Sequence, residues 1–256
     1  MEGDNMIGCL LIHGFTGSPE ELRPLAEYLH EHTDWQIHTP TLPGHGEGES
    51  MSTSTWELWL EFIEKEYLLL QDRCTEIYVI GFSMGGMIAA YLASKYSVSK
   101  LVLLSAAVFC LHPKMMIQEV KEAFMEPLKG QNSSSTMERY KYKIKQTPLR
   151  AVYHFRRLVW HVKPRLRHIT SPVLIVQGEK DMLVQPRSAT YIYQHVHSRI
   201  KELFYLGESK HIVCHDCEQE QLFEKVEDFL FDDVSGPVHS LSVMGDEKDE
   251  NQHKVP

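Results

Sequence analysis

The chain contains 256 residues, of which 43% are hydrophobic and 24% charged, a balance typical of a globular protein built around one large domain. Its formal net charge of −9 argues against nucleic-acid binding, and the lack of any apolar run of about 18 residues argues against a membrane-spanning helix. The first residues lack the basic and apolar regions of a signal peptide, and five cysteines, an odd number, favour a reducing compartment. We therefore expect a cytoplasmic protein.

The first half of the chain alternates short apolar runs with amphipathic segments. Residues 6–13 predict a strand that ends in the sequence HGFTG. Two capping boxes, Ser18 with Glu21 and Ser54 with Glu57, each predict the start of a helix with an apolar stripe. Further strands are predicted over residues 36–42, 77–80 and 101–105, and the first of them ends in a Pro-Gly-His-Gly loop at 43–46.

The pattern changes after residue 108. Residues 109–168 contain two or three helical stretches, interrupted by a flexible polar loop over 130–135. The alternation then resumes, with strands predicted at 172–177 and 201–206, a helix at 187–197 and a final helix capped by Asp216.

Strands that alternate with helices predict an α/β fold, in which a mostly parallel sheet carries helices on both faces. We assign residues 6–108 and 169–231 to the core of this fold. Residues 109–168 are interpreted as a small helical cap above the carboxyl edge of the sheet. Residues 232–256 are polar with little apolar periodicity, so a disordered tail is predicted there.

The chain is organised around a strand, a tight turn and a helix that surround Ser83. Residues 77–80 form an apolar strand, the sequence from Gly81 to Gly85 reads G-x-S-x-G, and the segment that follows has helical character. This arrangement is typical of a nucleophile elbow, in which a strained turn lifts the serine hydroxyl clear of the sheet. The N-terminal end of the following helix also favours negative charge beside the serine. We therefore predict that Ser83 is a catalytic nucleophile.

A serine nucleophile needs a base, and the base needs a third group that holds its tautomer. Both partners should follow later strands, because ligands bind at the carboxyl edge of open α/β sheets. Asp181 follows one buried strand and His211 follows the last one, which gives the α/β-hydrolase order of serine, acid and histidine. Glu179 is the alternative acid and His215 the alternative base.

Acyl transfer also needs two N–H donors for the oxyanion of the tetrahedral intermediate. The residue after the nucleophile, Met84, supplies one from its backbone, and a loop after an early strand supplies the other. We choose the backbone N–H of Phe15, because the His13-Gly14-Phe15 sequence lies at the end of the first strand.

The sequence resembles the α/β-hydrolase-fold serine esterases, and within them the small bacterial carboxylesterases and the related monoacylglycerol lipases. The resemblance extends from Ile7 to about Phe231. It is carried by HGFTG, by GFSMGG at the elbow, by an acid and a histidine after late strands, by the loop at 43–46 and by Lys145-Gln146-Thr147-Pro148.

This resemblance implies the triad Ser83, Asp181 and His211, an oxyanion hole formed by Phe15 and Met84, and a small helical cap over 109–168. It implies no cofactor and no metal. The chain departs from the family pattern in two ways. It begins almost at the strand before HGFTG, so the strands that open the eight-stranded archetype are largely missing, and it carries an appended polar tail.

These features predict a serine hydrolase that cleaves carboxylic esters through an acyl-enzyme, with short to medium acyl chains favoured. Monoacylglycerol lipase activity is the first alternative, and amidase, thioesterase or acyltransferase chemistry could use the same triad. The alternative from another class is a catalytically silent ligand-binding protein on the hydrolase fold. The expected partner is a small-molecule ester, with no nucleic acid.

The segment Cys214-His215-Asp216-Cys217 contains one C-x-x-C pair. A structural zinc site needs a second pair, so we interpret this segment as the start of the last helix. A cysteine of low pKa at that helix N-terminus is the alternative.

The cap region is basic within an acidic protein. Residues 138–168 contain ten Lys or Arg and one acidic residue, interleaved with Tyr140, Tyr142, Phe155 and Trp160. A solvated helix face explains this charge most simply. The alternative is attraction to anionic or lipid surfaces, or to acidic substrates.

Overall fold

The computed structural model describes residues 6–110 and 149–232. The polar loop predicted over 130–135, the residues Tyr140, Tyr142 and 145–148, and the predicted tail beyond Asp232 lie outside the described residues. Most of the predicted cap lies outside them too, so the boundaries of the cap stay a prediction.

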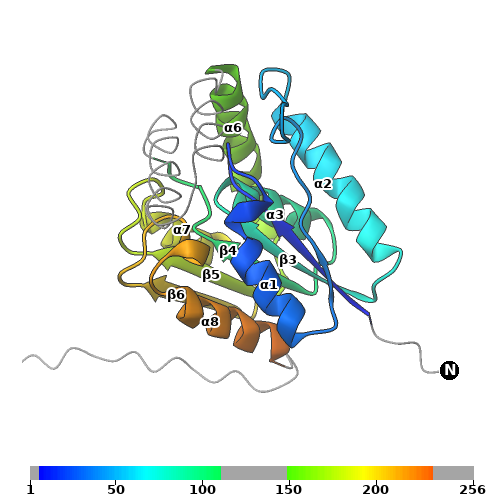
Figure 1. Cartoon of the computed structure of the whole chain (residues 1–256). Coiled ribbons are helices and arrows are strands. Elements are labelled where there is room, and N and C mark those ends of the chain that lie inside the picture. Colours follow the sequence, from blue (N-terminus) through cyan, green and yellow to red (C-terminus); the bar gives the residue numbers. More distant parts are fainter. Residues whose placement is uncertain (1–5, 111–148, 233–256) are drawn as a thin grey trace, which may run out of the picture.

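Six parallel strands form one sheet in the order β2-β1-β3-β4-β5-β6 (Figure 1). They are β1 (Ile7–Ile12), β2 (Gln36–His38), β3 (Glu76–Phe82), β4 (Lys100–Leu104), β5 (Val173–Gly178) and β6 (Lys201–Leu206). The α/β class and the parallel sheet are thereby confirmed. Strand β2 is shorter than predicted, because Pro40 has no N–H to donate to a strand ladder.

Helices cover both faces of the sheet. On one face, α1 (Arg23–His32) and α8 (Gln219–Phe231) lie side by side, in front of the sheet in Figure 1. The other face carries α2 (Trp56–Gln71), α3 (Met84–Lys95), α6 (Leu149–Val162) and α7 (Arg187–His195). Short 3-10 helices are η1 (Pro19–Glu21), η3 (Lys163–His168) and η4 (Val213–His215).

The alternation of side chains along each strand builds a core on each face of the sheet. Along β1, Cys9 and Leu11 belong to the core under α1 and α8, whereas Leu10 and Ile12 belong to the core under α2 and α3. Because both faces are buried, the strands are apolar almost throughout instead of alternating with polar residues. This double burial holds the carboxyl ends of the strands in place, where the candidate site lies.

Two predicted capping boxes are wrong. Ser18 forms no capping hydrogen bond, and α1 begins only after η1. The N-cap of α2 is Thr55, not Ser54, and Ser54 Oγ instead donates to the carbonyl of Pro43 at 2.9 Å. The capping-box pattern considers only neighbours in sequence, whereas Ser54 finds its partner 11 residues away.

Asp216 also does not cap the last helix. Its carboxylate accepts from the backbone N–H groups of Lys210 and Cys217, at 2.7 and 2.8 Å, and Glu218 is the residue that precedes α8. Asp216 therefore organises the loop that carries His211.

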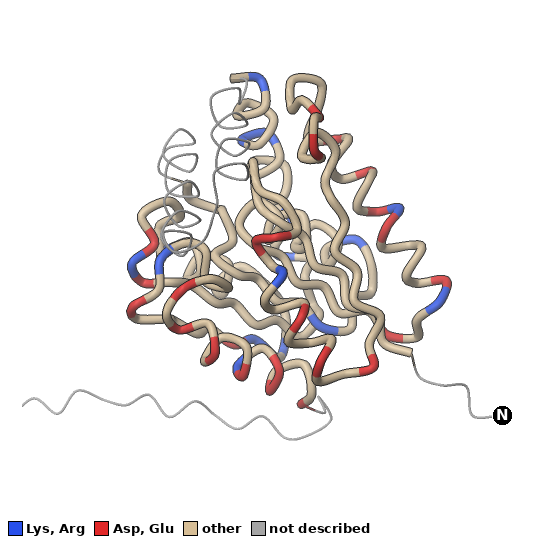
Figure 2. The backbone as a smooth tube through the Cα atoms, in the orientation of Figure 1, with Lys and Arg blue, Asp and Glu red and all other residues tan. Residues whose placement is uncertain are grey.

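Helix α6 packs along α3 through Ala151, Phe155, Leu158 and Val162, which are buried in the core of that face. It contains three arginines and no acidic residue, whereas acidic residues are frequent along α2 and α8 (Figure 2). Among the described residues, no helix combines the length and the apolar character that crossing a membrane requires.

Candidate active site

Ser83 occupies the sharp turn between β3 and α3. Its backbone angles are φ 55° and ψ −115°, a strained conformation that non-glycine residues rarely adopt. Glycines on either side make the turn possible. A Cβ on Gly81 would lie 2.3 Å from the carbonyl oxygen of Gly85, and a Cβ on Gly85 would lie 2.0 Å from that of Ile12. The predicted elbow geometry is therefore present.

The structure brings Ser83, His211 and Asp181 together in one buried chain of hydrogen bonds. His211 Nε2 lies 3.0 Å from Ser83 Oγ, and His211 Nδ1 lies 2.7 Å from Asp181 Oδ2. Because a carboxylate only accepts hydrogen bonds, its contact places the imidazole proton on Nδ1. Nε2 is then free to accept the serine proton, as a general base must.

Asp181 is held in a fixed orientation by its own partners. Its Oδ1 accepts from the backbone N–H groups of Leu183 and Val184 at 2.8 and 2.9 Å, and its Oδ2 accepts from Gln177 Nε2 at 2.9 Å as well as from His211. These bonds aim Oδ2 at the imidazole.

The two alternatives do not reach Ser83. Glu179 is exposed at the end of β5. His215 Nε2 donates to the backbone carbonyl of Glu20 at 2.8 Å, and burial lowers the pKa of its imidazole. Of the two candidate pairs, only Asp181 and His211 complete a chain to the serine.

The topology explains why residues far apart in the sequence meet here. The chain leaves β1 toward β2 on one side and leaves β3 toward β4 on the other, so the strand order reverses between β1 and β3. Such a switch point opens a crevice at the carboxyl edge of the sheet. The HGFTG loop follows β1, the elbow follows β3, and the loops with Asp181 and His211 follow β5 and β6.

The predicted oxyanion donors lie at the same edge. Met84 is the first residue of α3, and an N–H in the first turn has no acceptor within its helix. Phe15 follows β1, and a Cβ on Gly85 would lie 2.5 Å from the carbonyl oxygen of His13, so the loop after β1 abuts the first turn of α3. His13 Nε2 also accepts from the N–H of Leu42 at 3.0 Å, which ties this loop to the next one.

Glu21 is a residue of the site that our sequence analysis missed, because it was assigned to a capping box. Its side chain is 1% exposed, and its Oε2 accepts from the backbone N–H of Gly14 at 2.8 Å, beside Phe15. Burial raises the pKa of Glu21 to about 7, although the Gly14 hydrogen bond and the charge of nearby His211 both act to lower it. Glu21 thus anchors the loop that carries a predicted oxyanion donor.

A sequence signal for this burial did exist. Glu21 lies four residues before Leu25 and eight before Leu29, which both belong to the buried stripe of α1. A carboxylate in register with such a stripe points into the protein.

The raised pKa of Glu21 predicts a pH-dependent stability. Between pH 4.5 and about 7 the folded protein retains a proton that the unfolded chain releases, so the contribution of Glu21 to stability is largest at low pH. It should decline by about 3 kcal/mol as pH rises through this window. Glu21→Gln removes the titration, so the unfolding free energy of the variant relative to the parent should rise with pH.

Urea unfolding at pH 4.5 and pH 8 measures this difference. Glu20→Gln is the matched control, since Glu20 is the exposed neighbour and pairs with Arg23 at the surface. A difference between Glu21→Gln and parent that stays constant over this pH range would contradict the assignment.

The C-x-x-C pair has the character of ordinary cysteines. Cys214 is buried, Cys217 is exposed, and neither forms a disulfide. Burial raises the pKa of the Cys214 thiol, and the pKa of Cys217 is also raised, by desolvation and by the neighbouring Asp216. The alternative of a low-pKa cysteine is therefore wrong. Within residues 6–110 and 149–232, no cluster of three His, Cys, Asp or Glu side chains could hold a metal ion.

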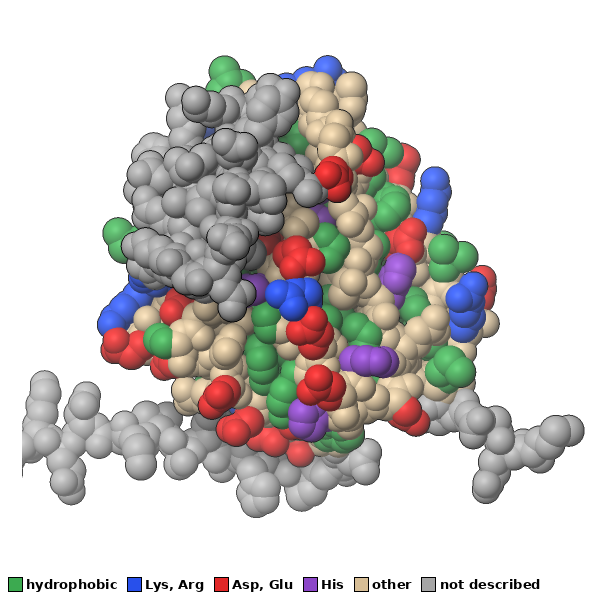
Figure 3. Space-filling model, viewed as in Figure 1, with side chains coloured by type: hydrophobic (Ala, Val, Ile, Leu, Met, Phe, Trp, Pro, Cys, Tyr) green, Lys and Arg blue, Asp and Glu red, His purple; other side chains and the backbone are tan. Residues whose placement is uncertain are grey.

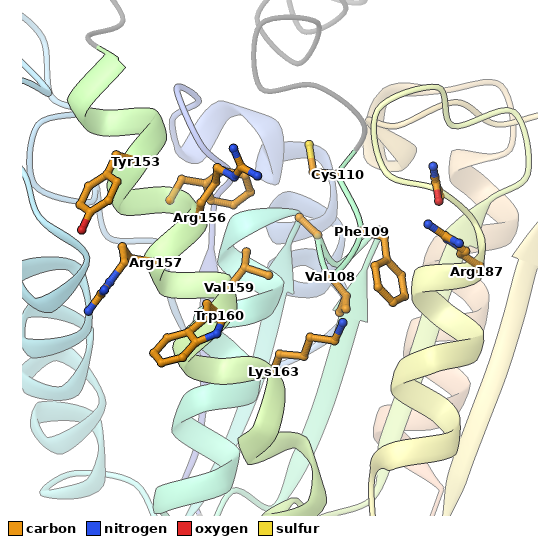
Figure 4. Close-up of a pocket in the computed structure, with 13 residues that line it drawn as sticks. Val108, Phe109, Cys110, Tyr153, Arg156, Arg157, Val159, Trp160, Lys163 and Arg187 are labelled. Carbon is orange, nitrogen blue, oxygen red and sulfur yellow. The ribbon is translucent and has the colours of Figure 1, made fainter.

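A cavity of about 740 Å³ lies between α6, the segment after β4 and the start of α7 (Figure 4). Its wall includes Ala107, whose N–H donates to the Ser83 carbonyl at 3.1 Å. It also includes Phe155 of α6, which stacks on Phe15 with 5.1 Å between the ring centroids. The cavity is therefore linked through Ala107 to the backbone of Ser83 and through Phe155 to the loop with the predicted oxyanion donor.

Comparisons with known proteins agree with this geometry. The sequence profile of the family described as "Serine aminopeptidase, S33", a group of hydrolases, matches residues 7–218. A thermostable monoacylglycerol lipase of Bacillus sp. (strain H-257) is 31% identical over 228 residues, which cover 88% of this chain and 90% of that protein. A carboxylesterase of Bacillus subtilis (strain 168) is 27% identical over 231 residues, covering 89% and 93% respectively.

Solved structures agree as well. A structure from work on LipS and LipT, two metagenome-derived lipolytic enzymes, superposes with a TM-score of 0.72 at 26% identity, covering 88% of this chain and 94% of that chain. A monoacylglycerol lipase of Paleococcus ferrophilus superposes with a TM-score of 0.65 at 16% identity, covering 87% and 93%, and that likeness concerns the fold alone.

Proposed function

The chain belongs to the serine aminopeptidase (S33) family of α/β hydrolases, and from this premise we propose that it is a carboxylesterase whose catalytic triad is Ser83, His211 and Asp181. The chain is a serine hydrolase, and two of its relatives are named for ester cleavage, one as a monoacylglycerol lipase and one as a carboxylesterase. The observation that carries the finer proposal is the hydrogen-bond chain from Ser83 Oγ through both nitrogens of His211 to Asp181.

In the proposed reaction, His211 Nε2 takes the proton of Ser83 Oγ as the oxygen attacks the ester carbonyl. The oxyanion of the tetrahedral intermediate accepts hydrogen bonds from the N–H groups of Phe15 and Met84. His211 then gives its proton to the leaving alcohol, and the same histidine activates the water that hydrolyses the acyl-enzyme. Asp181 stabilises the imidazolium at each stage.

The proposed substrates are esters with short to medium acyl chains. Apolar walls formed by Ala107, Val108, Phe155 and Val159 suit an acyl chain beside the serine. Esters of glycerol are the second candidate, because a relative covering 88% of this chain is named a monoacylglycerol lipase.

A fluorophosphonate probe and a series of p-nitrophenyl esters test this proposal. We expect the probe to label Ser83 and the turnover to pass through an optimum in acyl-chain length. Matched p-nitroanilides separate esterase from amidase activity, and monoacylglycerols test the second candidate. If well-folded protein shows no labelling and no turnover, that result would favour the alternative of a catalytically silent ligand-binding protein.

We also propose that the outer face of α6 associates with anionic lipid surfaces. This face carries Leu149, Tyr153 and Trp160, which are 76%, 56% and 71% exposed, together with Arg150 and Arg157. Exposed Trp and Leu beside arginines are typical of helices that lie at a membrane surface. The view in Figure 3 offers a contrast, since acidic side chains are frequent over α1 and α8 there.

Cosedimentation with vesicles tests the lipid proposal. Binding to vesicles that contain anionic lipid should weaken as salt rises from about 0.1 M to about 1 M, because the Debye length falls from about 10 Å to about 3 Å. Replacing Leu149 and Trp160 by serine should weaken binding further. Leu69→Ser on α2 is the control, as Leu69 is 53% exposed elsewhere on the protein. Absent or salt-independent binding would contradict the proposal.

A further inference from the structure

The cavity linked to the Ser83 turn through Ala107 is lined by positive charge. Four of its lining residues are the cations Arg156, Arg157, Lys163 and Arg187, and no described lining residue is acidic. In Figure 4, Lys163 lies below Val108 and Arg187 lies beside Phe109, whereas Arg156 extends upward from α6, away from them, and Arg157 lies below Tyr153. Two cations from separate elements, Lys163 of η3 and Arg187 of α7, therefore lie on the same apolar part of the cavity.

These cations have no carboxylate partner within residues 6–110 and 149–232, where the ion pairs involve other residues. Lys163 and Arg187 contact the ring of Phe109, with 4.2 and 4.7 Å from the charged groups to its centroid. An aromatic face offsets only part of the repulsion between two cations that share it. An anion in the cavity would offset the rest.

The position of Phe109 is fixed relative to the catalytic loop. Its N–H donates to Ser188 Oγ at 3.1 Å and its carbonyl accepts from the N–H of Gln185 at 3.1 Å, while Cys110 pairs with Val184. Val184 also donates its N–H to Asp181. The ring that Lys163 and Arg187 contact is thus fixed to the loop that carries Asp181.

We propose that the ester hydrolysed at Ser83 carries an anionic group, a carboxylate or a phosphate, which Lys163 and Arg187 bind while the apolar inner wall receives the alkyl part. The inference rests on the proposed function and extends it to a class of substrate. Guanidinium groups suit such anions because their planar array of donors matches carboxylate and phosphate oxygens.

Two matched pairs of esters test the inference and locate the anion. The first pair is p-nitrophenyl hexanoate and the p-nitrophenyl monoester of adipic acid, which adds a carboxylate to the end of the acyl chain. The second pair is a monoacylglycerol and the monoacylglycerol phosphate with the same chain, which adds the charge to the alcohol. In one of the pairs, kcat/KM should be about 10- to 100-fold higher for the anionic member.

The double variant Lys163→Gln/Arg187→Gln should reduce that preference to near unity. Arg199→Gln is the matched control, because Arg199 is an exposed arginine outside both the cavity and the proposed lipid-binding face of α6, and it should keep the parent preference. High salt should reduce the preference of the parent enzyme as well, since the cations lie near solvent.

Equal kcat/KM within both pairs, with the neutral esters hydrolysed normally, would overturn this inference and leave the proposed function intact. A preference that survives the double variant would overturn it too. Calorimetry with hexyl phosphate and hexanol provides a readout that needs no turnover. Binding of the phosphate alone supports the inference even if Ser83 proves not to be catalytic, and binding of neither compound contradicts it.

Discussion

Ser83→Ala is expected to abolish ester hydrolysis and labelling by a fluorophosphonate while leaving the fold intact. The substitution removes the attacking oxygen, which lies at the end of the hydrogen-bond chain that runs from Asp181 through His211. We expect kcat to fall by about a millionfold, with a residual rate from the oxyanion donors alone. The lost hydrogen bond to His211 should change the free energy of unfolding by only about 1–2 kcal/mol. Steady-state kinetics with a p-nitrophenyl ester and a thermal melt measure the two effects.

Ser105 offers a matched control for this variant. It is also a buried serine with positive φ, 46°, directly after the neighbouring strand β4. Its hydroxyl has no hydrogen-bond partner among the described residues and is not joined to His211. Ser105→Ala should therefore retain activity. Loss of turnover in both variants would point to damage of the sheet edge instead of loss of a nucleophile.

Asp181→Asn is expected to lower kcat by about 10⁴-fold with little effect on the fold. All the hydrogen bonds to this side chain come from donors, namely two backbone N–H groups on Oδ1 and two side-chain N–H groups on Oδ2. An amide has one oxygen, and that oxygen would face the two backbone donors. Its NH₂ group would then face His211 Nδ1, and that nitrogen would have to accept the hydrogen bond. The imidazole proton would therefore lie on Nε2, so the histidine could not accept the serine proton.

Glu179→Gln is the control for the acid, because Glu179 is the exposed carboxylate two residues away on the same loop. It should leave kcat unchanged. The expected signature of Asp181→Asn is a fall in kcat with a nearly unchanged KM, since the acid does not contact substrate. Equal losses in the two variants would remove the reason for assigning Asp181 as the acid.

The sequence predicted the fold well, because the fold follows from periodic burial. Continuous apolar runs such as residues 77–80 can be satisfied only by a strand covered on both faces, and the alternation with amphipathic helices leaves few arrangements other than a parallel sheet. The nucleophile elbow was also predicted correctly from the sequence. Gly81 and Gly85 flank Ser83 at the two positions where a side chain would collide with backbone.

The helix caps and the buried carboxylate of Glu21 were not predicted correctly, because their hydrogen-bond partners are not the sequence neighbours that the capping-box pattern considers. Ser54 bonds to Pro43 instead of capping α2, and Glu21 bonds to Gly14 across a turn. Local spacing rules rank only neighbouring partners, so each of these side chains was assigned to the nearest helix end.

The sequence by itself therefore determined the class of fold, the candidate nucleophile and the few acids and bases that could act with it. Each of these depends on a local pattern of burial or turn geometry. The tertiary structure decided between the members of that set. Asp181 and His211 are separated by 30 residues, and His211 and Ser83 by 128, so only the order of β3, β4, β5 and β6 in the sheet sets the distances between them. The same arrangement joins Lys163 of η3 to Arg187 of α7 around one cavity, because charges from distant segments become neighbours only when the sheet is assembled.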